Sequence, residues 1–95
     1  MDDLVKNRIN NIRNRADDYI NYEQLIKDVA RADENKKPNY NKINDIQVLA
    51  SEYIDLDYLI IEIMRACNYT YQEIGEVYGT SRQAVFNKVK YHGLI

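Results

Sequence analysis

The chain has 95 residues, 45% of them hydrophobic and 29% charged, which is typical of one small globular domain and excludes a disordered chain. A single cysteine excludes an internal disulfide. With only one histidine and one cysteine in the chain, no zinc site is expected. No apolar stretch approaches the ~20 residues of a membrane span. The net charge of −2 argues against a protein that coats nucleic acid nonspecifically. The acidic start Met1-Asp2-Asp3 is not that of a signal peptide, so we expect a cytoplasmic protein.

A first helix is expected over residues 3–19, because apolar residues recur there every three or four positions. These residues are Val5, Ile9, Ile12, Ala16 and Ile20. Residues 4–15 also carry four basic side chains and no acidic one. The basic face is either a second contact with DNA or the solvated face of a helix that packs on the core.

A second helix is expected over residues 22–33, with Asn21 as its N-cap. Residues 34–41 predict a loop, because Pro38 disfavours helix at the residue before it and asparagines surround it. We expect the basic side chains in and beside this loop to be solvated, namely Lys36, Lys37 and Lys42. Residues 1–42 are therefore predicted to form an N-terminal helical arm or hairpin that serves in dimerisation or as an extra DNA contact.

Residues 43–67 form the most apolar segment, with apolar positions spaced by three and four residues. The positions are Ile46, Leu49, Tyr53, Leu56, Ile60, Ile63 and Cys67. This spacing fits the seam of a coiled-coil dimer, but apolar residues also fall outside it, which favours burial in a globular core. The segment is either one helix or two helices that break near Asp55, whose side chain suits an N-cap.

The last segment combines two short helices with a tight turn. Thr70 and Glu73 have the spacing of a capping box, which predicts the start of a helix over residues 71–78. Gly79 follows in the position that needs a left-handed backbone. Ser81 is then well placed to cap the second helix.

Residues 69–91 resemble the helix-turn-helix of bacterial and phage DNA-binding proteins, and most closely region 4 of sigma factors and small sigma-like regulators. The matching residues are Glu73-Ile74-Gly75, Tyr78, Gly79 and Ser81-Arg82-Gln83-Ala84-Val85. Lys88 departs from the pattern, since many members have an apolar residue there, and Val89 is expected to take over its packing. The resemblance implies that residues 43–95 are a DNA-binding domain with a three-helix core.

The resemblance also implies a role for individual residues. Ile74, Tyr78, Val85 and Val89 would face inward. The side chains that would read bases in the major groove are Arg82, Gln83, Phe86 and Asn87. Those that would contact phosphates are Thr70, Tyr71, Ser81, Lys88 and Lys90.

We therefore expect an all-α protein of four to five helices, with a C-terminal helix-turn-helix and an N-terminal helical arm. The expected function is sequence-specific binding of double-stranded DNA by a small bacterial or phage transcriptional regulator. Because one recognition helix reads few base pairs, a homodimer through the arm or residues 46–63 is expected. The alternatives are an adaptor or inhibitor that binds RNA polymerase or a host nuclease, which the acidic residues 45–67 favour, and a phage DNA-packaging or replication accessory protein.

No enzymatic activity and no cofactor or metal are expected. The single histidine lacks a nucleophile partner, and the chain has neither a phosphate-binding glycine loop nor a metal-binding motif. Neighbouring carboxylates such as Asp17 and Asp18 fall at expected helix ends, where capping explains them.

Overall fold

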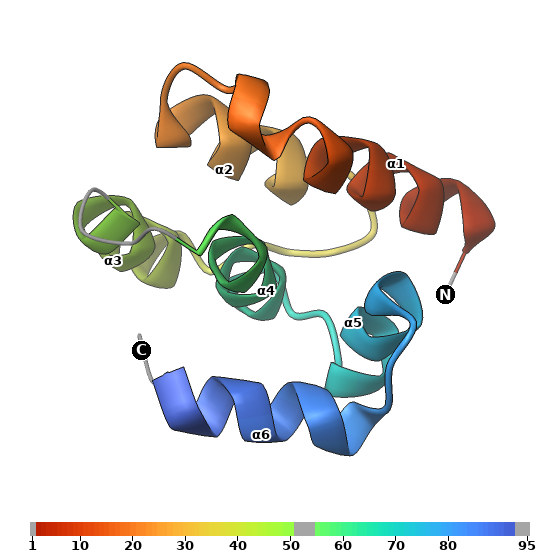
Figure 1. Ribbon diagram of the computed structural model, residues 1–95. Helices are drawn as coiled ribbons and strands as arrows, with labels where there is room; N and C mark the ends of the chain where they lie inside the picture. The colour runs from red at the N-terminus through yellow and green to blue at the C-terminus, as the bar shows by residue number, and fades with distance from the viewer. Residues whose placement is uncertain (1, 51–54, 93–95) are drawn as a thin grey trace.

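The structure is a computed structural model that describes residues 2–50 and 55–92. Within these ranges the chain forms six α-helices and one short 3-10 helix, Ala16–Asp18, with no strand. The α-helices are α1 (Asp3–Asn14), α2 (Tyr22–Ala30), α3 (Tyr40–Ala50), α4 (Leu56–Ala66), α5 (Tyr71–Tyr78) and α6 (Arg82–His92) (Figure 1). The all-α prediction is confirmed, whereas the described part alone holds more than the four to five helices expected. None of these helices is long and apolar enough to cross a lipid bilayer.

The extra helix arises at Asp55, whose side chain caps α4. The Asp55 carboxylate accepts a hydrogen bond from the backbone N–H of Tyr58 at 3.1 Å. Asn21 caps α2 in the same way, and the hydroxyl of Ser81 accepts from the N–H of Ala84 at the start of α6. The predicted caps are thus confirmed, and the segment over residues 43–67 contains two helices. Residues 51–54 between them lie outside the described part.

The first helix is shorter than predicted, and this changes the environment of Ile20. Helix α1 ends at Asn14, and residues 16–18 continue as a 3-10 helix with fewer residues per turn. The regular spacing of the apolar face is therefore lost before residue 20. The Ile20 side chain is 99% exposed, so its predicted place on the buried face is wrong.

Helix α4 lies at the centre of the fold, between the layer of α1 and α2 and helix α6 (Figure 1). It contacts α1, α2, α3 and α5. The buried residues of α4 are Tyr58, Leu59, Ile60, Ile61, Glu62, Ile63, Met64 and Ala66. Because Ile46, Ile60 and Ile63 are fully buried within one chain, the core interpretation is confirmed and the coiled-coil seam is wrong. The side chains of Leu49 and Tyr53 lie outside the described part.

One apolar cluster contains residues from all six helices. Helix α1 contributes Val5, Ile9 and Ile12, and α6 contributes Val85 and Val89. Helix α1 also contacts both α4 and α5. Residues 1–42 therefore pack directly on residues 43–95, and their separate role as an arm stays a prediction.

Gly79 makes the turn between α5 and α6, because its backbone is left-handed, with φ 65° and ψ 35°. A Cβ atom at this position would meet no atom within 4 Å, so a side chain would cost only backbone strain. We expect Gly79→Ala to lower the free energy of unfolding by about 1–2 kcal/mol in urea denaturation. Gly79→Asn should cost less, because asparagine tolerates this backbone, as Asn68 does with φ 69°. Equal costs for the two variants would contradict this explanation.

Candidate nucleic-acid interface

Helices α5 and α6 contact each other and present different faces to the core and to solvent. Ile74, Val85 and Val89 are buried, in agreement with their predicted inward orientation. Tyr78 is only half-buried, and the guanidinium group of Arg13 covers one face of its ring, 3.8 Å from the ring centroid. Its hydroxyl donates a hydrogen bond to the backbone oxygen of Asp57 at 3.0 Å, and burial raises its pKa.

The turn that leads into α6 approaches α5 closely at Gly75. A Cβ atom on this buried glycine would lie 2.6 Å from the backbone oxygen of Thr80 and 3.3 Å from the carbonyl carbon of Ser81. The backbone N–H of Thr80 also donates to the oxygen of Gly75 at 2.9 Å. Any side chain here would therefore push the turn away from α5.

The residues predicted to contact DNA are all at least partly accessible. The exposed ones are Thr70, Ser81, Arg82, Gln83, Phe86, Asn87 and Lys90. Tyr71 and Lys88 are half-buried. The Gln83 side-chain amide donates to the Asn87 side-chain oxygen at 3.1 Å, so these two groups lie together one helical turn apart.

Phe86 exposes 42% of its surface and contacts Tyr71 edge to face, with the ring centroids 5.6 Å apart. This contact joins the predicted reading face of α6 to the start of α5. Tyr71 thus has a packing role that its predicted phosphate contact did not include. An exposed phenylalanine held in this way presents an apolar edge among hydrogen-bonding neighbours.

An open groove of about 780 Å³ lies beside this face. It brings together five of the predicted residues, namely Thr70, Tyr71, Arg82, Gln83 and Phe86, whereas Ser81, Asn87, Lys88 and Lys90 lie outside its lining. The groove also includes Lys42 from α3 and Arg65 from α4, to which the sequence had given no binding role. No aspartate or glutamate is among its described lining residues.

Arg65 is held in place by two neighbours. One of its terminal nitrogens donates to the carboxylate of Glu62 at 3.0 Å, and its guanidinium carbon lies 5.5 Å from the centroid of the Tyr71 ring. Glu62 is only 2% exposed and also accepts a hydrogen bond from the Tyr58 hydroxyl at 2.9 Å. The spacing of three residues between Glu62 and Arg65 could have predicted this pair on one helix face.

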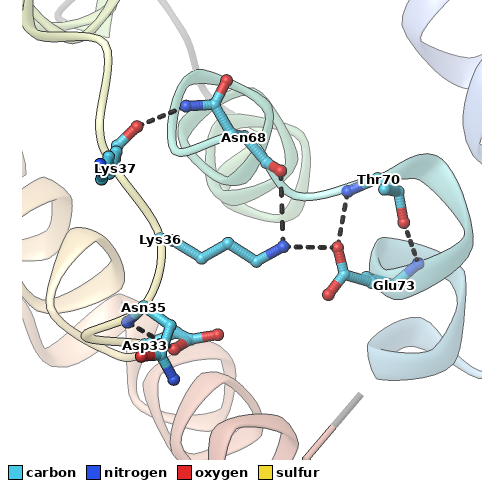
Figure 2. Close-up of polar contacts among 7 residues, drawn as sticks. All are labelled: Asp33, Asn35, Lys36, Lys37, Asn68, Thr70 and Glu73. Carbon is cyan, nitrogen blue, oxygen red and sulfur yellow. Dashed lines mark hydrogen bonds and ion pairs between the residues drawn. The ribbon is translucent and has the colours of Figure 1, made fainter.

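A polar network fixes the start of α5 to the loop before α3 (Figure 2). Thr70 and Glu73 form the predicted capping box, in which each side chain accepts the other residue's backbone N–H. The Lys36 ammonium group donates to the Glu73 carboxylate at 2.7 Å and to the backbone oxygen of Asn68 at 3.5 Å. The Asn68 side chain donates to the backbone oxygen of Lys37. The expectation that Lys36 is solvated is therefore wrong, because Glu73 provides a partner 37 residues away.

The network predicts a stability that depends on pH. Burial alone would raise the pKa of Glu73, but hydrogen bonds from Lys36 and the Thr70 backbone outweigh it and lower the pKa of this carboxyl below its usual range. A carboxyl with a lowered pKa in the folded state stabilises the fold at neutral pH and loses that contribution as pH falls through its folded pKa. We therefore expect Glu73→Gln to be less stable than the wild type at pH 7.

Urea denaturation over a pH series would measure this difference. The difference in the free energy of unfolding between Glu73→Gln and the wild type should begin to shrink as pH falls below the ordinary glutamate pKa of about 4.3. It should disappear below the lower pKa of the folded chain, where the carboxyl is protonated in both the folded and the unfolded state. The control is Glu34→Gln, which neutralises an exposed glutamate near the same loop. A gap that stays constant with pH, or one of equal size in the control, would contradict the charge assignment.

The basic face of α1 is partly used within the fold. The Arg13 side chain donates to the backbone oxygen of Val77 at 3.3 Å and lies 3.5 Å from the Asp57 carboxylate. The Arg8 side chain donates to the backbone oxygen of Ala32 at 3.1 Å. Since α1 also buries its apolar face, these contacts favour packing on the core over an independent DNA contact.

The described residues offer no metal site, because no three histidine, cysteine, aspartate or glutamate side chains among them gather closely enough. Cys67 is fully buried, and burial raises the pKa of its thiol to about 11. The thiol is therefore protonated at neutral pH and lacks nucleophilic character.

The groove and the exposed face of α6 suit a ligand that is anionic and rich in hydrogen-bonding groups. Lys42, Arg65 and Arg82 supply positive charge, and Gln83 and Asn87 supply amide donors and acceptors. The rings of Tyr71 and Phe86, which contact each other, add apolar surface next to these polar groups. The chain matches no protein-family model, and no curated protein and no solved structure shows significant similarity to it.

Proposed function

We propose that this chain is a helix-turn-helix protein that binds double-stranded DNA in a sequence-specific way and regulates transcription in a bacterium or phage. One observation carries the proposal: Arg82, Gln83, Phe86 and Asn87 form an exposed row on the first half of α6. The adjoining face of this helix is anchored in the core through Val85 and Val89. A helix held in this way can enter a major groove with its N-terminal half.

The row has the chemistry that distinguishes base pairs. The Arg82 guanidinium group matches the O6 and N7 acceptors of guanine, and an asparagine or glutamine amide matches N6 and N7 of adenine. Phe86 offers an apolar edge to a thymine methyl group. Gln83 and Asn87 bond to each other in the free protein, so one amide is already oriented by the other.

The proposal includes a homodimer, because one helix reads only a few base pairs. Two recognition helices on a two-fold axis would contact half-sites about one helical turn apart. Of the two surfaces considered for dimerisation, residues 46–63 include α4, most of which is buried in the core of its own chain. We therefore propose the outer face of residues 1–42 for the dimer.

Selection of bound duplexes from a random pool would test the function. At ~0.15 M salt, nonspecific phosphate binding is weak and sequence preference dominates recovery. We expect an enriched inverted repeat, with protein-free beads as the background control and circular dichroism to verify the helical fold. Recovery of no motif by folded protein would overturn the proposal and favour the protein-binding alternative.

The adaptor alternative has less support than the acidic middle of the sequence suggested. Glu62 is buried and paired with Arg65, Asp55 caps α4, and Asp57 pairs with Arg13. These three carboxylates serve contacts within the chain, which leaves less of the acidic charge free for a partner such as RNA polymerase.

A further inference from the structure

We infer that Lys42 and Arg65 bind backbone phosphates of the same DNA strand that α6 reads, so that the DNA interface extends across the groove onto α3 and α4. This inference rests on the proposed function and names two residues outside the helix-turn-helix segment. It also predicts what they contribute, which is affinity and salt dependence rather than choice of sequence.

The groove is continuous with the proposed reading face. Arg82, Gln83 and Phe86 line it from α6, Lys42 lines it from α3 and Arg65 lines it from α4. Contacts connect the two sides, because the Tyr71 ring touches Phe86 edge to face and also lies near the Arg65 guanidinium. A strand whose bases meet α6 would therefore present flanking phosphates to α3 and α4.

The charge of the groove favours an anion. Its described lining contains three cations and no carboxylate. Glu62 neutralises part of the charge of Arg65 but is itself buried, so it presents little negative surface to a ligand. Lys42 is exposed, and its side chain is long and flexible enough to follow a phosphate as a point charge.

Arg65 is arranged for phosphate binding before any ligand arrives. A guanidinium group has five N–H donors, and Glu62 accepts from one terminal nitrogen of Arg65. The pair with Glu62 and the contact with Tyr71 fix the plane of the group, while its side chain keeps 27% of its surface exposed. Binding therefore needs little ordering of this side chain, which reduces the entropic cost of association.

The test is the salt dependence of binding to two duplexes, one with the selected motif and one with its base pairs shuffled. For Lys42→Ala we expect weaker binding to both duplexes, an unchanged ratio between them, and a slope of log K against log salt that falls by ~0.9. The matched control is Lys27→Ala, which removes an exposed lysine on α2 outside the groove. It should change neither quantity, after size-exclusion chromatography has shown that it keeps the oligomeric state of the wild type.

Arg65 requires a paired substitution, because its removal alone would leave the Glu62 carboxylate buried without a cation. The double variant Glu62→Gln, Arg65→Gln replaces the ion pair by two neutral amides at unchanged net charge. We expect it to reduce the slope by a similar amount, after urea denaturation has shown that it is folded. Its effect should add to that of Lys42→Ala if the two residues bind different phosphates.

The outcomes separate this inference from the proposed function. If the wild type binds the motif and Lys42→Ala behaves like Lys27→Ala, the groove does not bind phosphate. The proposal that α6 reads bases would then be unaffected. If Lys42→Ala changes the ratio between the two duplexes instead of the slope, the groove reads bases and the inference is overturned. If the wild type binds neither duplex, both proposals fail.

Discussion

The triple variant Arg82→Ala, Gln83→Ala, Asn87→Ala is expected to lose sequence-specific DNA binding while it keeps the wild-type fold. All three side chains are exposed, and alanine favours a helix, so the free energy of unfolding should change little. A good bidentate contact with a base contributes ~1–3 kcal/mol of discrimination. Even at the lower end, three such contacts amount to about a hundredfold in Kd.

Fluorescence anisotropy with the selected duplex and a shuffled duplex would measure this loss. The variant should bind both duplexes with the same weak affinity, because it keeps Lys88 and Lys90, the lysines proposed to contact phosphates. The matched control removes the same three residue types from exposed positions on and beside the other helices, as Arg31→Ala, Gln47→Ala, Asn44→Ala. Size-exclusion chromatography first verifies that this control keeps the oligomeric state of the wild type. Wild-type discrimination in the α6 variant would show that this helix does not read DNA.

The substitution Gly75→Ala is expected to destabilise the fold and to weaken DNA binding together. Its Cβ atom would lie 2.6 Å from the backbone oxygen of Thr80, which cannot move aside as a side chain can. Overpacking of this kind typically costs about 1–3 kcal/mol. The shift needed to relieve it would turn α6 relative to α5 and displace the row that begins at Arg82.

The direction of the change in the free energy of unfolding distinguishes this prediction from the usual effect of such a substitution. Inside a helix with free space, replacing glycine by alanine stabilises the fold by roughly 0.5–1 kcal/mol. Urea denaturation should instead show a loss for Gly75→Ala, with Gln72→Ala, an exposed position on the same helix, near the wild type. A stabilised Gly75→Ala variant would mean that the close approach of α6 to α5 does not constrain the turn.

The sequence predicted those features that depend on residues a few positions apart. The caps at Asn21, Asp55 and Thr70 form because each side chain reaches a backbone N–H within three residues. The left-handed turn at Gly79 follows equally from one residue, since glycine has no Cβ atom and adopts this backbone without steric cost. The prediction that Ile20 is buried was wrong for a local reason as well, because a 3-10 helix interrupts the spacing on which it rested.

Local patterns along the chain were therefore enough to predict the all-α class, most helix starts, the turn before α6 and the exposed residues of that helix. The contacts between distant residues depended on the packing of the helices. Lys36 pairs with Glu73 across 37 positions, and Lys42 joins Arg65 and Arg82 in one groove. Such partners depend on how the helices pack around α4, and this packing arises from many weak apolar contacts between residues that follow no fixed separation along the chain. For the same reason, the apolar pattern of residues 43–67 fitted a dimer seam as well as a core, until burial of Ile46, Ile60 and Ile63 within one chain decided between them.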